Sequence, residues 1–169
     1  MAVVNSEQLL EQAEQLFAPS AAGAPRQVDL RRSISAAYYA VFHFVLSMAA
    51  DQFVGATKRQ SSRYVLVYRS VNHAALKKLC EKLTRPSVSD DILLHFPSGG
   101  LGPNLPFAAS AVVELQEKRH LADYDPSQRF NVSDAKRAVE TAASTIRRLK
   151  KLNTKRREAF LTLLCFSSR

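Results

Sequence analysis

DLRRSISAAYYAVFHFVLSMAA, residues 29–50, decides the fold, because its apolar residues recur at helical spacing. A second apolar face is added by Phe42, Leu46 and Phe53. A helix that is apolar on two sides has neighbours on both, so we expect this one at the centre of a helical bundle. The main stripe repeats at the 3.6-residue period and consists of Leu30, Ile34, Ala37, Tyr38, Val41, Val45 and Met48.

Further helices are predicted wherever apolar residues repeat at helical spacing, and polar or Pro- and Gly-rich connectors separate them. The connectors are 18–25, 56–62 and 84–106. The chain is therefore expected to fold as an all-α, up-and-down bundle of five or six helices. Besides the central helix, the predicted helices run from Asn5 or Ser6 to near Ala18, over 63–83, over 107–124, from a cap at Ser133, and from Asn153 or Thr154.

The length of 169 residues suggests one domain. We expect residues 1–152 to form the bundle and residues 153–169 to form a short basic helix that packs on it or extends it. The longest apolar stretch, 36–50, is shorter than the roughly 20 residues that cross a bilayer, so no membrane contact is expected. The Gly-rich stretch 97–106 lacks the strand and the Lys-Ser/Thr of a P-loop, and a mobile surface loop or lid is the simpler interpretation.

The two cysteines, Cys80 and Cys165, are far apart and form no CxxC pattern. His73 and Cys80 share a helix face, but two ligands do not make a zinc site, and we interpret them as packed side chains. No disulfide, metal or cofactor is therefore expected, and a reducing cytoplasm fits this cysteine usage best.

Positive charge is concentrated near the C-terminus. The formal net charge is +9, and residues 136–157 hold nine basic residues against the single acid Glu140. Such a segment attracts phosphates or an acidic protein surface, although a solvated helix face has the same composition. The candidate phosphate contacts are Arg147, Arg148, Lys150, Lys151, Arg156 and Arg157.

A second concentration of ionisable groups lies at the end of the predicted 107–124 helix, in RHLADYDP at 119–126. Arg119 can reach Asp123, and His120 can reach Tyr124, because each pair is spaced i,i+4. Carboxylates are disfavoured in the last turn of a helix by a few tenths to about 1 kcal/mol each, so a cation should offset them. These residues either form part of a functional site or are only an ion-paired helix end followed by an Asp-Pro turn.

The central helix carries a matching polar edge. Arg32, Ser35, Tyr39 and His43 fall within an arc of about 80°. Either these are amphipathic side chains that reach water, or they form one polar pocket together with the guanidinium of Arg119 from the predicted 107–124 helix. In the second case the ligand-binding cluster consists of Arg32, Tyr39, His43, Arg119, Asp123, Tyr124 and Asp125.

Together, RRSISAAYYAVFH (31–43) and RHLADYDP (119–126) resemble the HEPN domain superfamily, in particular its small bacterial stand-alone branch with an R-x-x-A-D-Y-D helix end. The resemblance covers about residues 5–152 and implies a dimeric up-and-down bundle. Active HEPN ribonucleases carry Arg, then four to six residues, then His, and cut RNA without metal. Arg119 matches the arginine, and His120 takes the polar position after it. The positions for the histidine hold Tyr124, Asp125 and Pro126.

Three functions follow from this resemblance. The first is a binding or regulatory module that engages RNA, a nucleotide or a nucleotidyltransferase partner of a toxin–antitoxin pair. The second is a metal-independent ribonuclease toxin that uses Arg119, His120 and Tyr124, with His43 or His120 replacing the missing imidazole. The third is a dimeric scaffold whose polar cluster supports packing. The missing histidine favours binding over cleavage, and the exposure of Arg119 and Tyr124 separates binding from scaffolding.

Overall fold

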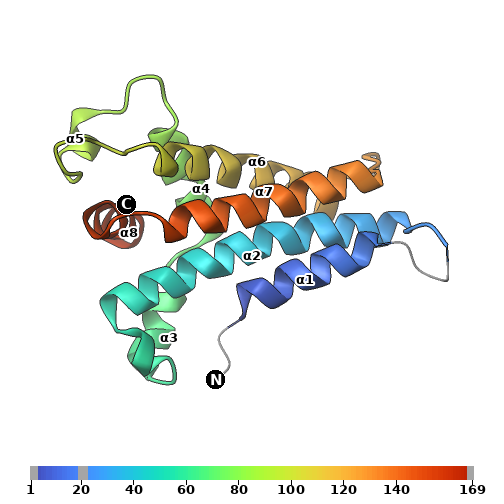
Figure 1. The fold of residues 1–169 in the computed structure, drawn as a ribbon, viewed down its shortest axis with the longest axis horizontal. Coiled ribbons are helices and arrows are strands. Elements are labelled where there is room, and N and C mark those ends of the chain that lie inside the picture. The colour runs from blue at the N-terminus through green and yellow to red at the C-terminus, as the bar shows by residue number, and fades with distance from the viewer. Residues whose placement is uncertain (1–3, 19–22, 167–169) are drawn as a thin grey trace.

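The computed structural model describes residues 4–18 and 23–166, and these ranges contain eight α-helices, one 3₁₀ turn and no β-strand (Figure 1). The predicted all-α fold class is confirmed. The predicted number of helices was too small, because the helix predicted over 63–83 is two helices and the predicted connector 84–106 contains a short helix at Asp90–Leu93. The helices are α1 (Ser6–Phe17), α2 (Gln27–Phe53), α3 (Ser62–Tyr68), α4 (His73–Leu83), α5 (Asp90–Leu93), α6 (Asn104–Tyr124), α7 (Val132–Lys150) and α8 (Thr154–Phe166).

Helix α2 lies at the centre, as its two apolar faces predict. It packs against α1, α6 and α7, which run alongside it (Figure 1). Ile34, Tyr38, Val41 and Val45 of the predicted stripe have no exposed surface. Each turn of α2 therefore contributes to a shared hydrophobic core, and the polar edge of α2 is held at a fixed angle to the neighbouring helices.

Within the described residues, α2 is also the one helix whose length of 27 residues and apolar composition would suit a membrane span. Inside the bundle, however, 61% of its most apolar 18-residue window is buried. Core helices of globular domains commonly meet the same criteria, because they too are apolar on more than one face.

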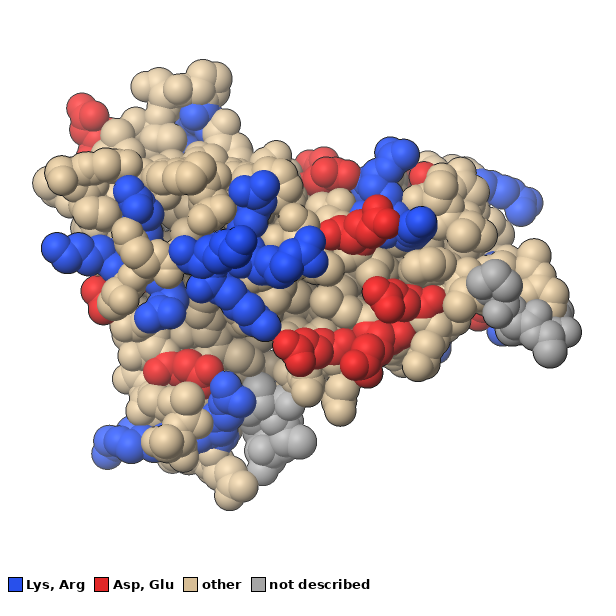
Figure 2. Space-filling model, in the orientation of Figure 1, with Lys and Arg blue, Asp and Glu red and all other residues tan. Residues whose placement is uncertain are grey.

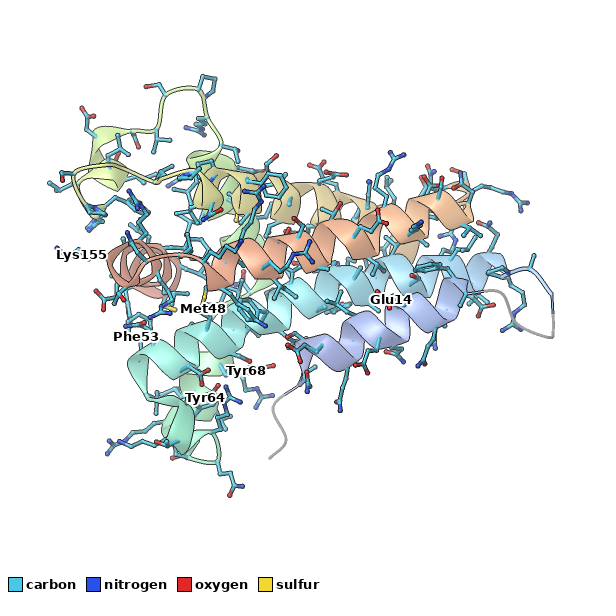
Figure 3. The ribbon with its side chains drawn as sticks, in the orientation of Figure 1. Glu14, Met48, Phe53, Tyr64, Tyr68 and Lys155 are labelled. Carbon is cyan, nitrogen blue, oxygen red and sulfur yellow. The ribbon has the colours of Figure 1, made fainter. Side chains whose placement is uncertain are left out.

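The single helix predicted over 63–83 is wrong, because α3 ends at Tyr68 and α4 begins at His73. Asn72 caps α4: its side-chain oxygen accepts the N–H of Ala75 at 2.8 Å. Tyr64 and Tyr68 of α3 point toward α2 (Figure 3), where the Tyr64 hydroxyl donates to Asp51 at 2.9 Å. The break thus turns α3 so that its tyrosines reach α2.

Other helix ends show how capping decides boundaries. Asn5 caps α1 as predicted, accepting the N–H of Glu7 at 2.9 Å. Asn131, not Ser133, caps α7, because its side chain accepts from Asp134 while the Asp134 carboxylate accepts from Asn131. Helix α6 starts at Asn104, three residues before the prediction, since a proline is tolerated in the first turn. The predicted connector at 18–25 lies partly outside the described residues.

The 84–106 segment is packed against the bundle and is not a free surface loop. Phe96 and Leu101 are buried. Arg156 of α8 donates from Nε to the carbonyl of Gly100 at 2.9 Å and from Nη2 to that of Gly99 at 3.2 Å. A Cβ at Gly102, whose φ is +66°, would lie 2.9 Å from Arg156 Nε. The absence of side chains at these glycines therefore leaves room for the Arg156 side chain. The apolar residues of α8, among them Phe160 and Leu161, belong to the same hydrophobic core.

Candidate functional site

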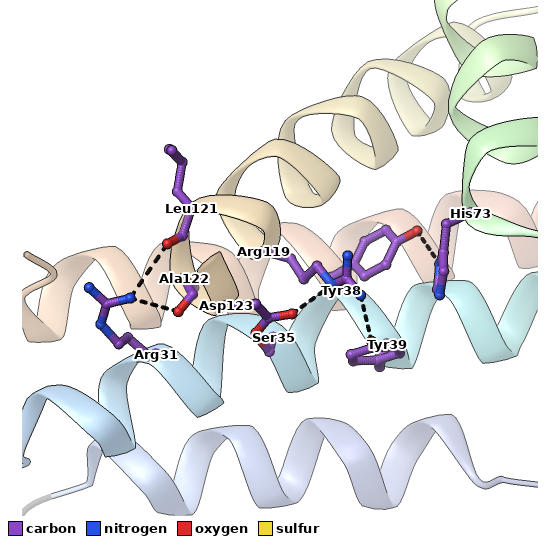
Figure 4. A network of polar contacts seen from close by, with 9 residues as sticks. All are labelled: Arg31, Ser35, Tyr38, Tyr39, His73, Arg119, Leu121, Ala122 and Asp123. Atoms are coloured by element: carbon purple, nitrogen blue, oxygen red, sulfur yellow. Dashed lines mark hydrogen bonds and ion pairs between the residues drawn. The ribbon is translucent and has the colours of Figure 1, made fainter. Parts of the chain in front are cut away.

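The two sequence motifs meet where the last turns of α6 cross α2. Arg119 Nη2 donates to the Tyr39 hydroxyl at 2.7 Å (Figure 4). The guanidinium carbon lies 5.3 Å from the centre of the Tyr39 ring and 5.8 Å from that of Tyr38. The predicted convergence of Arg119 with the polar edge of α2 is therefore confirmed as geometry.

The predicted contacts within the end of α6 are also present. Arg119 Nε lies 2.8 Å from Asp123 Oδ2, although the N–H direction does not make a hydrogen bond. Asp123 also accepts from the Ser35 hydroxyl, so the carboxylate bridges α6 and α2. His120 and Tyr124 place their ring centres 5.0 Å apart. The Arg119 side chain is only 12% exposed and forms the centre of the network.

Two cations offset the acidic helix end: Arg119 pairs with Asp123 as predicted, and Arg31, which was not among the predicted site residues, binds the backbone carbonyls. Its guanidinium donates to the carbonyls of Ala122 and Asp125, each at 2.8 Å (Figure 4 shows the first), and also to that of Gln128. A fourth, longer contact reaches the Leu121 carbonyl. Arg31 thus supplies positive charge and donors to the last carbonyls of α6, which have no partner within the helix.

Two tyrosine–histidine pairs extend the network beyond the predicted residues. The Tyr38 hydroxyl lies 2.8 Å from Nδ1 of His73, and the Tyr68 hydroxyl lies 2.7 Å from Nδ1 of His43. His43 was predicted at this site, whereas Tyr38 was assigned to the apolar stripe of the central helix and His73 to packing, and Tyr68 was given no role. Tyr38 could have been predicted to belong to the network, because it is adjacent in sequence to Tyr39. Only the tertiary packing of α3 and α4 brings Tyr68 and His73 to α2.

Burial sets the protonation of these groups. Desolvation lowers the pKa of His43 and, together with the charge of Arg119, lowers that of His73. Burial raises the pKa of the Tyr38 hydroxyl. Both imidazoles are therefore neutral at pH 7, and each holds a tyrosine hydroxyl at Nδ1.

A groove of about 690 Å³ runs between α1, α2 and the end of α6. Its polar wall is the predicted edge of α2 together with one carboxylate of α6. Apolar side chains also line it, with Leu9 and Leu16 from α1 and Val28 from the start of α2, next to the polar Gln12 and Arg31. The polar wall consists of Arg32, Ser35, Tyr39, His43 and Asp123.

The remaining predicted residues do not line this groove. His120 lines a smaller pocket of about 380 Å³ between α4 and α6, which Arg119 also borders. Tyr124 is 65% exposed. Asp125 turns away to accept from Ser127, whose hydroxyl lowers the pKa of that carboxyl. Arg119 therefore separates a groove on the α1–α2 side from a pocket on the α4 side.

The basic segment gathers over the end of α7 and over α8, on the face shown in Figure 2. Several of its members have internal partners. Arg148 lies 3.8 Å above the ring of Phe107, and Lys150 pairs with Glu7 at 3.2 Å. Arg156 donates to the carbonyls of Gly99 and Gly100, as described above. Within the described residues, Arg147 and Lys151 are exposed and form no ion pair.

No group of three or more His, Cys, Asp or Glu side chains in residues 4–18 and 23–166 is arranged to hold a metal ion. Comparisons with protein-family models, with curated proteins and with solved structures found no match to this chain. The described residues of the site offer one deep guanidinium, several hydroxyls, two neutral imidazoles and an amphipathic groove.

Proposed function

We propose that the chain is a HEPN-like binding or regulatory module that takes a nucleotide, or an unpaired base of RNA, into the groove between α1, α2 and α6. The observation that carries the proposal is the 2.7 Å bond between Arg119 and Tyr39, which joins the two HEPN-resembling motifs at the wall of one groove. A groove lined by both apolar and hydrogen-bonding side chains suits a ligand that has a flat face and polar edges.

The wall residues match the parts of a nucleotide. Tyr39 and His43 stack with ring centres 6.1 Å apart and present aromatic edges to the groove. Leu9 and Leu16 offer an apolar surface to the face of a base. Arg32, which is exposed at the rim, is free to bind a phosphate.

Arg119 has a positioning role in this proposal. Its side chain is 12% exposed, and its polar atoms already face Tyr39 and Asp123. Ligand contact therefore falls to Arg32, Tyr39 and His43, while Arg119 fixes the orientation of Tyr39. This division also explains why an arginine is needed at position 119 without a histidine at positions 124–126.

The proposed partners are a second copy of the chain and a nucleotidyltransferase. Three apolar side chains near the start of α2 and the end of α6 are exposed: Val28 by 49%, Leu121 by 39% and Tyr124 by 65%. Exposed aromatic and aliphatic groups beside a polar site are typical of contact surfaces. Light scattering of the purified protein tests the dimer directly, since the mass of one chain is 18.8 kDa.

One observation favours a second candidate, the interaction scaffold. The near-complete burial of Arg119 and its internal partners are what a packing role requires. The two functions differ at the rim of the groove: a scaffold has no use for Arg32 in ligand binding.

The test is binding of AMP by calorimetry and of a labelled decauridylate by fluorescence anisotropy. Arg32→Gln should weaken binding by about tenfold, which is typical of losing one charge-assisted contact. Arg63→Gln, an exposed arginine of α3, removes the same charge away from the groove and should leave affinity within about twofold. Absence of binding by the wild type, or equal losses in both variants, would favour the scaffold.

The ribonuclease alternative has its own test. We expect the purified protein to release no fragments from single-stranded RNA, because His43 Nδ1 is held by Tyr68 and no imidazole follows Arg119 at the required distance. Cleavage by the wild type that is lost in Arg119→Ala would reverse this assignment.

A further inference from the structure

A second cavity, of about 520 Å³, lies at the other end of α2, between the start of α1 and the junction of α7 with α8. None of the predicted groove residues lines it. From its charges and its apolar wall, we propose that this cavity binds a small phosphate-bearing molecule that has a flat apolar group. The proposal is independent of the nucleotide groove, since the two cavities have no lining residue in common.

The cavity is lined by three basic side chains and two acidic ones, so one cation has no acidic partner in the lining. Lys150 pairs with Glu7 at 3.2 Å, and Arg59 pairs with Asp51 at 2.8 Å. Arg157 of α8 also lines the cavity, is half-buried, and forms no ion pair with any described residue. Its Nε is buried and has no hydrogen-bond acceptor in residues 4–18 and 23–166. A guanidinium in this situation lacks compensation, which an anion entering the cavity would supply.

The surroundings strengthen the attraction for an anion. Exposed Arg147, Lys151 and Lys155 belong to the same α7–α8 region, where basic side chains gather in Figure 2. Their summed potential raises the local concentration of anions at the mouth of the cavity. The planar guanidinium of Arg157 matches the geometry of phosphate oxygens.

The apolar wall selects among anions. Phe44 and Met48 of α2 line the cavity, and the ammonium of Lys150 lies 5.8 Å from the centre of the Phe44 ring. An aromatic ring and a thioether are favourable neighbours for a flat ligand ring. The volume is within the usual range for small-molecule sites, about 300–1,000 Å³. A ligand with both a phosphate and a ring therefore uses more of the cavity than phosphate alone.

The experiment titrates the full chain with phenyl phosphate and with inorganic phosphate at constant ionic strength, using calorimetry. Phenyl phosphate should bind more tightly than phosphate. Arg157→Gln should weaken phenyl phosphate binding by about tenfold, which corresponds to losing one charge-assisted contact. Arg85→Gln is the matched control, because it removes the same charge from an exposed position in the 84–106 segment that does not line the cavity, and it should change affinity by less than about twofold.

A second measurement does not depend on the folding of any variant. In the amide NMR spectrum of the wild type, saturable shifts should appear at Ser6, Ser47 and Gln52, which line this cavity, and not at Ser35 or Ala36 of the groove. No saturable binding, equal weakening by the two arginine variants, or shifts confined to the groove would each overturn the proposal. Failure here leaves the nucleotide groove untouched, since that site is probed by Arg32→Gln.

Discussion

The C-terminal ends of α6 and α7 both collect charged side chains, but they are stabilised in different ways. The last turn of α7 holds Arg147, Arg148 and Lys150, which suit the negative end of the helix dipole. The last turns of α6 hold Asp123, followed by Asp125, where carboxylates are unfavourable. The end of α7 is therefore favoured by its own sequence, whereas the end of α6 depends on the pairing of Asp123 with Arg119 and on Arg31 from another helix.

The difference between the two helix ends shows which charged residues carry information about tertiary contacts. A charge that agrees with its helix needs no partner elsewhere, and its presence says little about the tertiary structure. A charge that opposes its helix indicates that a partner exists, either one turn away, as Arg119 is for Asp123, or on another helix, as Ser35 is. At the end of α6 the opposing carboxylates indicate a crossing with α2, and that crossing creates the candidate site.

The largest effect is expected from removing the partner that the end of α6 requires. Arg31→Met should lower the free energy of unfolding by about 3 kcal/mol, because several partly buried carbonyls lose their donor. Urea denaturation measures the loss. Arg31→Lys should recover part of it, since an ammonium keeps the charge but cannot reach the same set of carbonyls.

Arg32→Met is the matched control for Arg31→Met. Arg32 is the exposed neighbour in the same turn of α2, and its removal should change stability by less than about 0.5 kcal/mol. If the two variants are equally stable, the contacts of Arg31 with the end of α6 do not contribute to the free energy of unfolding, and the contrast between the ends of α6 and α7 fails.

A smaller effect is expected at the centre of the network. Arg119→Gln should cost about 2 kcal/mol of stability, because it removes the bond to Tyr39 and the pairing of Asp123. Lys118→Gln breaks only an exposed i,i+4 pair with Glu114 and should cost up to about 0.5 kcal/mol. Thermal unfolding of Arg119→Gln and Lys118→Gln measures these two costs. The coupling between Arg119 and Tyr39 is measured by adding Tyr39→Phe alone and Tyr39→Phe combined with Arg119→Gln. Additive effects in that cycle would show that the bond contributes nothing.

Much of the fold was predictable because periodicity reports burial directly. The stripe of α2 from Leu30 to Val45 is buried as expected, and Asn5 caps the first helix. The break between α3 and α4 was missed because alternating and helical apolar patterns overlap across 63–83. Asn72, a good N-cap residue, was the signal that could have divided the segment.

The candidate site was predictable only where its contacts follow helix spacing. Arg119 with Asp123, and the single polar edge of α2, both come from the helical repeat. His73 could not be placed at the site, because its contact with Tyr38 depends on the angle at which α4 packs. The groove itself also depends on α1, whose apolar residues looked like ordinary core positions.

The two tyrosine–histidine pairs predict that stability depends on pH. Burial lowers the pKa of His43 and His73 in the folded protein below the value of about 6.5 in an unfolded chain. The unfolded chain therefore binds more protons as the pH falls, so stability present above about pH 6.5 is lost below it. Urea midpoints at pH 7.5 and 5.5 measure this loss. His73→Gln should reduce it, and His95→Gln, in the exposed part of the 84–106 segment, should not.

The smallest effects are expected at the end of α7, where the charges agree with the helix. Lys150→Gln breaks an exposed pair with Glu7 and should change stability by less than about 0.5 kcal/mol, and by less still in high salt. Arg148→Gln should cost about 1 kcal/mol, because that guanidinium lies 3.8 Å from the centre of the Phe107 ring and keeps this contact in salt. Urea denaturation at low and high salt measures both variants. If Lys150→Gln proves the more costly, α7 ends on a specific long-range contact as α6 does, and the distinction between the two helix ends fails.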